Sequence, residues 1–261
     1  MSRDQQRIAL QPAYVLHRRP YKESKALIDL LTPEYGRIAV VASGVRSHKS
    51  RRKALLQPFC PLLISWFGRG ELFTLTNAEQ QGAPLNIRPG ELMLGFYVNE
   101  LLFRLVSRFE ANIELFGFYD QTLRELARTH TDNYSPNAVQ AILRRFEIRL
   151  LENLGYGLIL DHDANSNEPI EPRLVYDYQL NRGPVANRNN RHIIGVEILG
   201  SSLLNLAKSI PDNLIADKKF MLESKNLLRY VLNYYLGEKP LLSRQLYQNT
   251  ASKVKPTQIV N

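Results

Sequence analysis

The sequence predicts an α+β protein with a β-rich first part and a mainly helical second part. Three observations predict this division. In the first 80 of 261 residues, β-branched and aromatic residues recur in short runs between turn residues. From about residue 90, apolar residues recur every three or four positions, which is the spacing of one helix face. The stretch 161–194 is rich in Asn, Asp, Pro and Gly and breaks both periods.

Five runs of the first part are expected to be strands, at 8–19, 25–32, 36–43, 57–67 and 71–79. Pro58 and Pro61 cannot both lie within a sheet, so we expect the fourth strand to become regular at about Leu62. A small closed barrel suits five short strands because closure leaves no edge exposed, and the OB-fold is the commonest such solution. We therefore place a nucleic-acid-binding OB-fold domain over 1–80.

A helical domain is expected over 81–250. Apolar spacing predicts its first three helices at 94–105, 113–126 and 143–154, and further helices at 196–210, 218–237 and 239–249. The stretch 161–194 is predicted to be an irregular insertion with a possible strand at 173–178. Residues 251–261 are expected to form a flexible tail.

Positive charge is concentrated in the first domain. The chain has a net charge of +9, and residues 1–80 contain 13 Lys and Arg against 6 acids. The run "GVRSHKSRRK" at 44–53 lies between two expected strands, and aromatic residues alternate with the cations of the domain. Single-strand binders combine cations that neutralise phosphates with aromatic rings that stack on bases. The alternative is a solvated charged face without a partner.

We expect the DNA-binding side chains to be basic residues of this domain. They are Arg18, Arg19, Arg37, Arg46, Lys49, Arg51, Arg52, Lys53 and Arg69. Stacking is not assigned to any one aromatic residue, because strand alternation turns some of them into the core.

Arginines flank an apolar helix face in the segment 141–157. Such arginines often have no specific role. An apolar groove rimmed by arginines is also suited to an acidic peptide with hydrophobic anchors. The residues expected to form this peptide site are Phe116, Tyr119, Leu143, Arg144 and Arg145.

Signatures of catalysis, metal binding and membrane insertion are lacking. No Walker lysine loop, HExxH, GxSxG or Gly-rich dinucleotide fingerprint occurs, so we expect no enzyme activity and no cofactor. Cys60 is the single cysteine, and the candidate metal ligands Asp161, His162 and Asp163 are better explained as turn residues, so no metal site is expected. No membrane span or secretory signal is visible, which predicts a cytoplasmic protein.

Five segments together resemble the bacterial RecO family of recombination mediators and DNA repair proteins. They are "AYVLHRRPYKESKALIDLLTPEYGRIAVVASGVRS", "LLQPFCPLLISWFGRGEL", "GFYVNELLFRLV", "LRRFEIRLLENLGYG" and "GEKPLLSRQLY". The resemblance implies an OB-fold followed by a helical domain. It also implies binding of single- and double-stranded DNA, strand annealing, and partnership with RecR and with the acidic C-terminal tail of single-stranded DNA-binding protein (SSB).

The chain departs from the family pattern in one segment. Many members carry a four-cysteine zinc site after "LGYG", whereas "LILDHDANSNEPIEP" contains no cysteine. We therefore expect packing and hydrogen bonds to hold this segment.

The expected function is a DNA-binding and annealing mediator without catalytic activity. Two alternatives remain open. One is a metal-dependent nucleic-acid hydrolase that uses Asp161, Asp163 and Glu171, and the other is an RNA-binding OB-fold protein.

Overall fold

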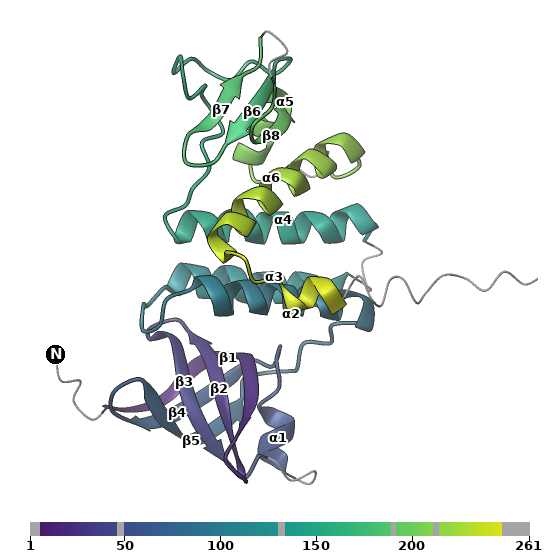
Figure 1. Ribbon diagram of the computed structural model, residues 1–261. Coiled ribbons are helices and arrows are strands. Elements are labelled where there is room, and N and C mark those ends of the chain that lie inside the picture. The colour runs from purple at the N-terminus through teal and green to yellow at the C-terminus, as the bar shows by residue number, and fades with distance from the viewer. Residues whose placement is uncertain (1–5, 46–49, 130–133, 189–191, 211–213, 247–261) are drawn as a thin grey trace, which may run out of the picture. The chain divides into compact units, whose positions relative to one another are not determined.

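The computed structural model describes residues 6–45, 50–129, 134–188, 192–210 and 214–246 (Figure 1). Spatial contacts divide the chain into two units, of which the first comprises 1–127 and 240–261 and the second comprises 128–239. The sequence placed a boundary at residue 80, where the β-rich pattern ends. Spatial contacts group the first two long helices with the barrel, and the boundary at residue 80 stays a prediction. The tail expected at 251–261 lies outside the described residues.

A closed five-stranded barrel forms the first part of unit one. Its strands are β1 (Gln6–Tyr21), β2 (Lys25–Thr32), β3 (Gly36–Ser43), β4 (Leu62–Gly68) and β5 (Leu72–Gln80). The order around the barrel is β1-β2-β3-β5-β4, with β3 and β5 parallel and the other pairs antiparallel. The predicted barrel is therefore confirmed, and β4 begins at Leu62, directly after the two prolines.

Alternation along the strands fills the barrel with apolar side chains. Ile28, Val40, Ile64 and Trp66 are each fully buried in one cluster of core residues. Long β1 closes the barrel because its first half pairs with β4 and its second half pairs with β2. A register shift between Val15 and His17 accompanies the pairing with β2.

A short helix that the sequence pattern did not predict interrupts the basic run between β3 and β4. It is α1 (Arg51–Leu55), and the Ser50 hydroxyl caps it by accepting a hydrogen bond from the Lys53 N–H at 3.2 Å. A helix of five residues is too short to show an apolar period. For this reason the sequence pattern indicated a basic run but not the helix within it.

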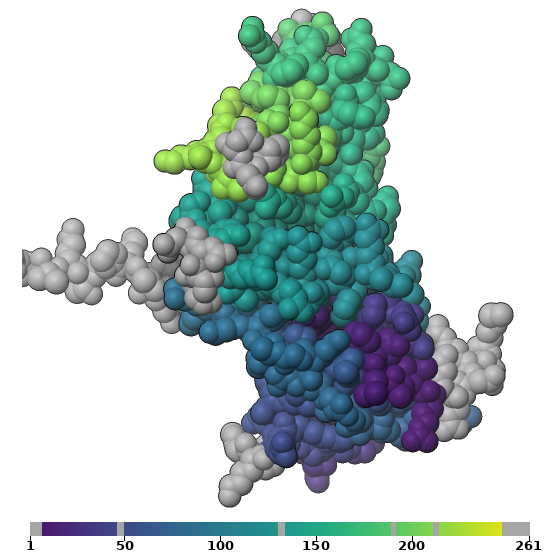
Figure 2. Space-filling view, turned by 180° about the vertical axis from the view of Figure 1, so that it is seen from behind, coloured from purple at the N-terminus to yellow at the C-terminus, as the bar shows by residue number. Residues whose placement is uncertain are grey.

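Helices α2 (Pro89–Leu105) and α3 (Ile113–Arg128) pack on the barrel through buried polar contacts. The Asn99 amide donates to the carbonyls of Val15 and Leu16 on β1, at 3.2 and 3.1 Å, and accepts from the Tyr119 hydroxyl at 2.5 Å. The Tyr14 hydroxyl donates to Asp120 at 2.5 Å. Figure 2 shows the barrel and these helices as one continuous surface. These contacts join helices and barrel into one folded unit.

The second unit contains helices and a small sheet. Its helices are α4 (Pro136–Asn153), α5 (Gly200–Ala207) and α6 (Lys218–Leu236), and the sheet has the order β7-β6-β8. The predicted helical region is confirmed. The segment 161–194 is more regular than expected, because it contains β6 (Val175–Gln179) and β7 (Gly183–Ala186). Strand β8 (Val196–Leu199) occupies the first residues of a segment predicted to be wholly helical.

Candidate nucleic-acid interface

One strand pairing and two hydrogen bonds show that basic residues gather at one end of the barrel. Lys25 at the start of β2 lies opposite Ser43 at the end of β3. The Arg18 guanidinium donates to the Val45 carbonyl at 2.8 Å, and the Arg52 guanidinium donates to the Thr76 carbonyl on β5 at 2.5 Å. The β1–β2 turn, the end of β3 and α1 therefore lie together. We call this surface the basic end and define it as Arg18, Arg19, Lys22, Lys25, Arg51, Arg52 and Lys53.

The members of the basic end differ in exposure and role. Arg19 and Arg51 are exposed, whereas Arg18, Arg52 and Lys53 are half-buried. Arg18 and Arg52 use part of their donor capacity to fix the backbone next to them. A guanidinium has five N–H donors, so each of these two side chains keeps donors for a phosphate. The basic end thus presents cations on a fixed backbone.

Arg37 does not belong to the basic end. Its Nε donates to the Val106 carbonyl at 2.9 Å, and its guanidinium lies 3.5 Å from the buried Asp29 carboxylate and 5.2 Å from the Phe103 ring centre. Desolvation by burial lowers the pKa of Arg37, although the charge of Asp29 opposes this effect. Arg37 therefore takes part in internal packing between β3 and the end of α2, and its expected contact with DNA stays a prediction.

Of the three other expected DNA contacts, the structure describes Arg69. Arg69 lies in the β4–β5 turn, next to the start of β1, because Gly68 is opposite Gln6. The β1–β2 turn of the basic end follows the other end of β1. Arg46 and Lys49 lie outside the described residues. Sequence reasoning grouped Arg69 with the others because it could not assign the turns to ends of the barrel.

Most aromatic residues of the barrel are buried or half-buried, some in the barrel core and Tyr14 against α3. Tyr14, Trp66 and Phe73 are buried, and Tyr21 and Tyr35 are half-buried. Phe67 is 38% exposed. Of these rings, Phe67 is the one that the structure presents to solvent.

The residues expected to bind a peptide lie in both units. Phe116 and Tyr119 belong to the first unit, where Tyr119 is fully buried and Phe116 contacts the Tyr14 ring. Leu143, Arg144 and Arg145 belong to the second unit. Because Tyr119 and Leu143 are buried, they support their helices and do not line an open surface.

The two adjacent arginines of α4 have different surroundings. Arg144 is 6% exposed and forms an ion pair of 2.7 Å with Glu147, which is fully buried. Arg145 is half-buried and donates to the Ile210 carbonyl at 3.1 Å. Arg144 is therefore committed to an internal ion pair, and Arg145 is the better placed of the two for an external carboxylate.

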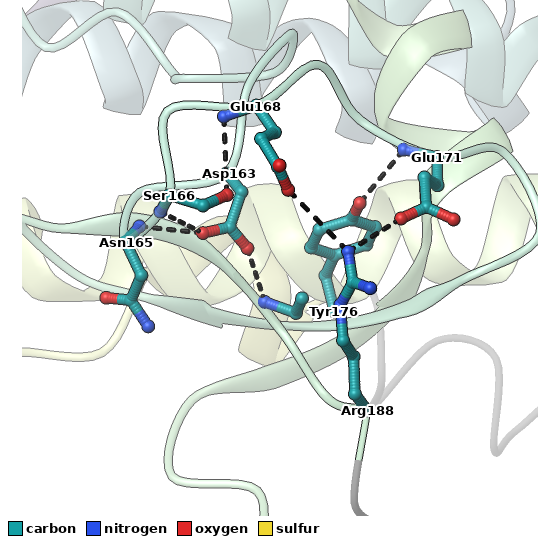
Figure 3. Close-up of polar contacts among 8 residues, drawn as sticks. Asp163, Asn165, Ser166, Glu168, Glu171, Tyr176 and Arg188 are labelled. Atoms are coloured by element: carbon teal, nitrogen blue, oxygen red, sulfur yellow. Dashed lines mark hydrogen bonds and ion pairs between the residues drawn. The ribbon is translucent and has the colours of Figure 1, made fainter.

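The segment after α4 is held by hydrogen bonds around Asp163 (Figure 3). Its buried carboxylate accepts from the N–H groups of Asn165, Ser166 and Ala186 at 2.7, 2.9 and 2.6 Å. Burial alone would raise the pKa of Asp163, but these backbone hydrogen bonds outweigh it and lower the pKa below its ordinary value. The carboxylate thereby joins the loop that follows α4 to the end of β7.

The other acids of this segment are also engaged. Glu171 pairs with Arg188 at 2.8 Å, and Asp161 lies 2.7 Å from the His162 ring. Within the described ranges, no three His, Cys, Asp or Glu side chains are grouped as a metal ion would require. The hydrolase alternative relied on Asp161, Asp163 and Glu171, but Asp163 is turned toward backbone N–H groups.

No helix among the described residues combines the length and apolar composition needed to cross a membrane.

Two family profiles match the chain over nearly its whole length. The profile described as recombination protein O N terminal matches residues 7–83, and the one described as recombination protein O C terminal matches residues 89–245. The chain is 46% identical to DNA repair protein RecO of Nitrosococcus oceani over 243 residues, which cover 93% of this chain and 94% of that protein. It is 43% identical to the RecO protein of Nitrosospira multiformis, over 94% of this chain and 97% of the relative.

Proposed function

Because the chain belongs to the RecO family of DNA repair proteins, we propose that it is a recombination mediator that binds single- and double-stranded DNA and anneals complementary strands. The family establishes a role in DNA repair. The proposal goes further by naming the ligand, the surface and the physical action. In the cell, the protein would act in the cytoplasm, at the nucleoid during repair.

The basic end of the barrel is the observation that supports this proposal. Its cations come from the end of β1, the β1–β2 turn, the start of β2 and α1, and the contacts of Arg18 and Arg52 fix the backbone beside them. Two DNA strands repel each other through their phosphates. Cations on a fixed surface neutralise these phosphates and release counterions, while the bases remain free to pair. Annealing by this route requires no covalent step, so we propose that the protein is not an enzyme.

We propose two protein partners, RecR and the acidic C-terminal tail of SSB, and the loading of recombinase onto SSB-coated DNA as the outcome. For the tail, Arg145 is the arginine that we assign to a peptide carboxylate, because Arg144 is paired with the buried Glu147. A charge-assisted hydrogen bond at an apolar rim would also fix the orientation of the peptide.

Annealing of complementary oligonucleotides precoated with SSB tests the proposal, in the absence of ATP and metal. We expect faster annealing with the full-length chain than with SSB alone. Cleavage of the strands after addition of Mg²⁺ would favour the hydrolase, and preferential binding to RNA in competition with single-stranded DNA would favour the RNA-binding alternative. Failure to accelerate annealing would contradict the proposal.

A further inference from the structure

An exposed row of side chains crosses the outer face of the barrel on β1, β4 and β5. Phe67 on β4 lies opposite Arg7 on β1 and opposite Thr74 on β5. All three are exposed, whereas Trp66 and Phe73, their neighbours along the chain, are buried. This alternation places Phe67, Arg7 and Thr74 on the outer side of the barrel.

Two arginines lie near Phe67 along the strands. Arg7 is its cross-strand neighbour, and Arg69 follows it by two residues in the β4–β5 turn. Both arginines are exposed, and neither forms an ion pair with a residue in the described ranges. Sequence-tolerant binders hold an unpaired base and its phosphates by combining an exposed aromatic ring with nearby cations.

Of the basic end, α1 is the part that comes near this row. Arg52 of α1 donates to the Thr76 carbonyl, and Thr74 lies two residues before Thr76 on the same strand. Two residues of a strand span about 7 Å, so the anchor of α1 lies about that far along β5 from Thr74, the cross-strand neighbour of Phe67. A single strand bound at α1 can therefore continue across β5 to Phe67 and Arg7.

We propose that Phe67 is a base-stacking platform for single-stranded DNA, with Arg7 and Arg69 as its phosphate contacts. This inference rests on the proposed function and extends it, because it assigns a stacking residue and a path for the strand. The path runs over β1, β4 and β5, whereas OB-folds commonly bind over strands 2 and 3. Leu10 and Leu72 are also exposed on the barrel, at 52% and 41%, and an apolar protein partner is the competing occupant.

Three variants of the full-length chain distinguish single-stranded DNA from a protein partner as the ligand of this surface. Binding of a fluorescent oligo-dT strand is measured by anisotropy over a range of salt concentrations. We expect Phe67→Ala to weaken binding about five-fold or more without a change in salt dependence, because it removes stacking but no charge. Phe67→Tyr should restore the affinity because it restores the ring. Leu72→Ala is the matched control, since it removes an exposed apolar side chain from the same barrel, and it should bind as the wild type does.

The double variant R7A/R69A tests the charges. It should reduce the slope of log affinity against log salt by about 1.4, or 0.7 for each lost phosphate contact on a single strand. Photocrosslinking of a halogenated oligonucleotide to the wild type should label Phe67.

The outcomes distinguish this inference from the proposed function. If the wild type binds oligo-dT and Phe67→Ala binds equally well, the platform is refuted and the proposed function stands. Equal losses in Phe67→Ala and Leu72→Ala in RecR binding, with DNA binding intact, would assign the surface to a protein instead. If the wild type does not bind oligo-dT at all, both proposals fail together.

Discussion

At the residue scale, the Asp163 carboxylate accepts hydrogen bonds from three backbone N–H groups. Two of them lie within its own loop, and the third is that of Ala186 at the end of β7. The hydrogen bonds favour the ionised form, and for this reason the pKa of Asp163 is lowered despite burial. One ionised side chain thus cross-links the segment in which many family members have a zinc site.

Replacement of Asp163 by Asn should destabilise the second unit. The amide nitrogen would face a backbone N–H group, so one buried donor would lose its acceptor, at a cost of about 1 to 3 kcal/mol. Urea unfolding measures the change in free energy. Asp161→Asn is the control, because the Asp161 side chain is 77% exposed. Equal stability of the two variants would contradict the cross-linking role.

The same residue predicts a dependence of stability on pH. Because the pKa of Asp163 is lower in the folded state, its stabilising contribution is fully present above the unfolded pKa of about 3.9 and is lost as pH falls through the folded value. The difference in unfolding free energy between wild type and Asp163→Asn should therefore shrink below about pH 4. A difference that stays constant from pH 7 to pH 3 would argue against an ionised Asp163.

Arg144→Ala and Arg145→Ala should have different effects. Loss of Arg144 removes the 2.7 Å ion pair of the buried Glu147 and should lower the stability by about 3 kcal/mol. Loss of Arg145 should weaken binding of the isolated SSB tail peptide by about 1.5 to 3 kcal/mol, because a charged hydrogen bond is lost. Calorimetry of tail binding and denaturant unfolding separate the two effects. Arg149→Ala is the control, and tail affinity unchanged by Arg145→Ala would place the site elsewhere.

At the scale of elements, α1 converts part of the basic run into a fixed surface. Its N-terminal cap is the Ser50 hydroxyl, which also donates to the Gly44 carbonyl at 2.5 Å, and Arg52 ties the helix to β5. The Arg18 contact with Val45 fixes the chain where it leaves β3. Short elements of this kind hold charge in place, which a flexible chain of the same composition cannot do.

Removal of the cations around α1 should weaken DNA binding and flatten its salt dependence. Replacing Lys49, Arg51, Arg52 and Lys53 by Ala should reduce the salt slope by up to about 3, since each phosphate contact on a single strand contributes about 0.7. The matched control removes four exposed cations of α6, namely Lys218, Lys219, Lys225 and Arg229. Equal losses in both variants would show that net charge, and not the basic end, governs binding.

The junction between β8 and α5 depends on a glycine. A Cβ atom at Gly200 would lie 2.0 Å from the Glu171 carbonyl oxygen, which no side chain tolerates without movement of the backbone. Gly200→Ala should therefore lower the melting temperature, since strain of this kind displaces the segment before β6 from the sheet. Gly157→Ala is the control, because a Cβ atom added at Gly157 would meet no atom within 4 Å apart from its own residue and its chain neighbours. An unchanged melting temperature for Gly200→Ala would contradict this packing.

At the scale of the whole molecule, the chain forms one unit, passes into a second and returns to the first. It leaves the first unit after residue 127 and returns at residue 240. On return, the Glu100 carboxylate of α2 accepts hydrogen bonds from the N–H groups of Leu242 and Ser243, both at 2.9 Å. The first unit is therefore held together by strand pairing and also by contacts with the C-terminal segment that begins at residue 240.

Chelators should neither unfold the protein nor abolish annealing. A closed zinc site needs several thiolate or imidazole ligands, and the chain has one cysteine, Cys60, which is buried in the barrel core. Thermal unfolding and annealing, each with and without EDTA, test this expectation. Stoichiometric zinc in the purified chain, lost on chelation together with stability, would overturn it.

The sequence by itself determined the barrel, the main helices and the family. Alternation predicted β2 and β3 to the residue, and two prolines predicted the start of β4. These features are local, because they depend on periodicity and on turn chemistry within a few residues. The short strands β7 and β8 carry too few residues to show a period, so the sheet in the second unit was not predicted.

Only the tertiary structure decided which residues can form a site. Arg37 and Arg52 have the same charge in the sequence, but one lies beside the buried Asp29 and the other anchors α1 to β5. Phe67 and Phe73 are both phenylalanines of expected strands. Strand register makes Phe67 exposed and Phe73 part of the core. Strand pairing joins residues that are far apart in the chain, and burial follows from that pairing. The composition of the chain therefore does not show which strands pair or which of two like residues is buried.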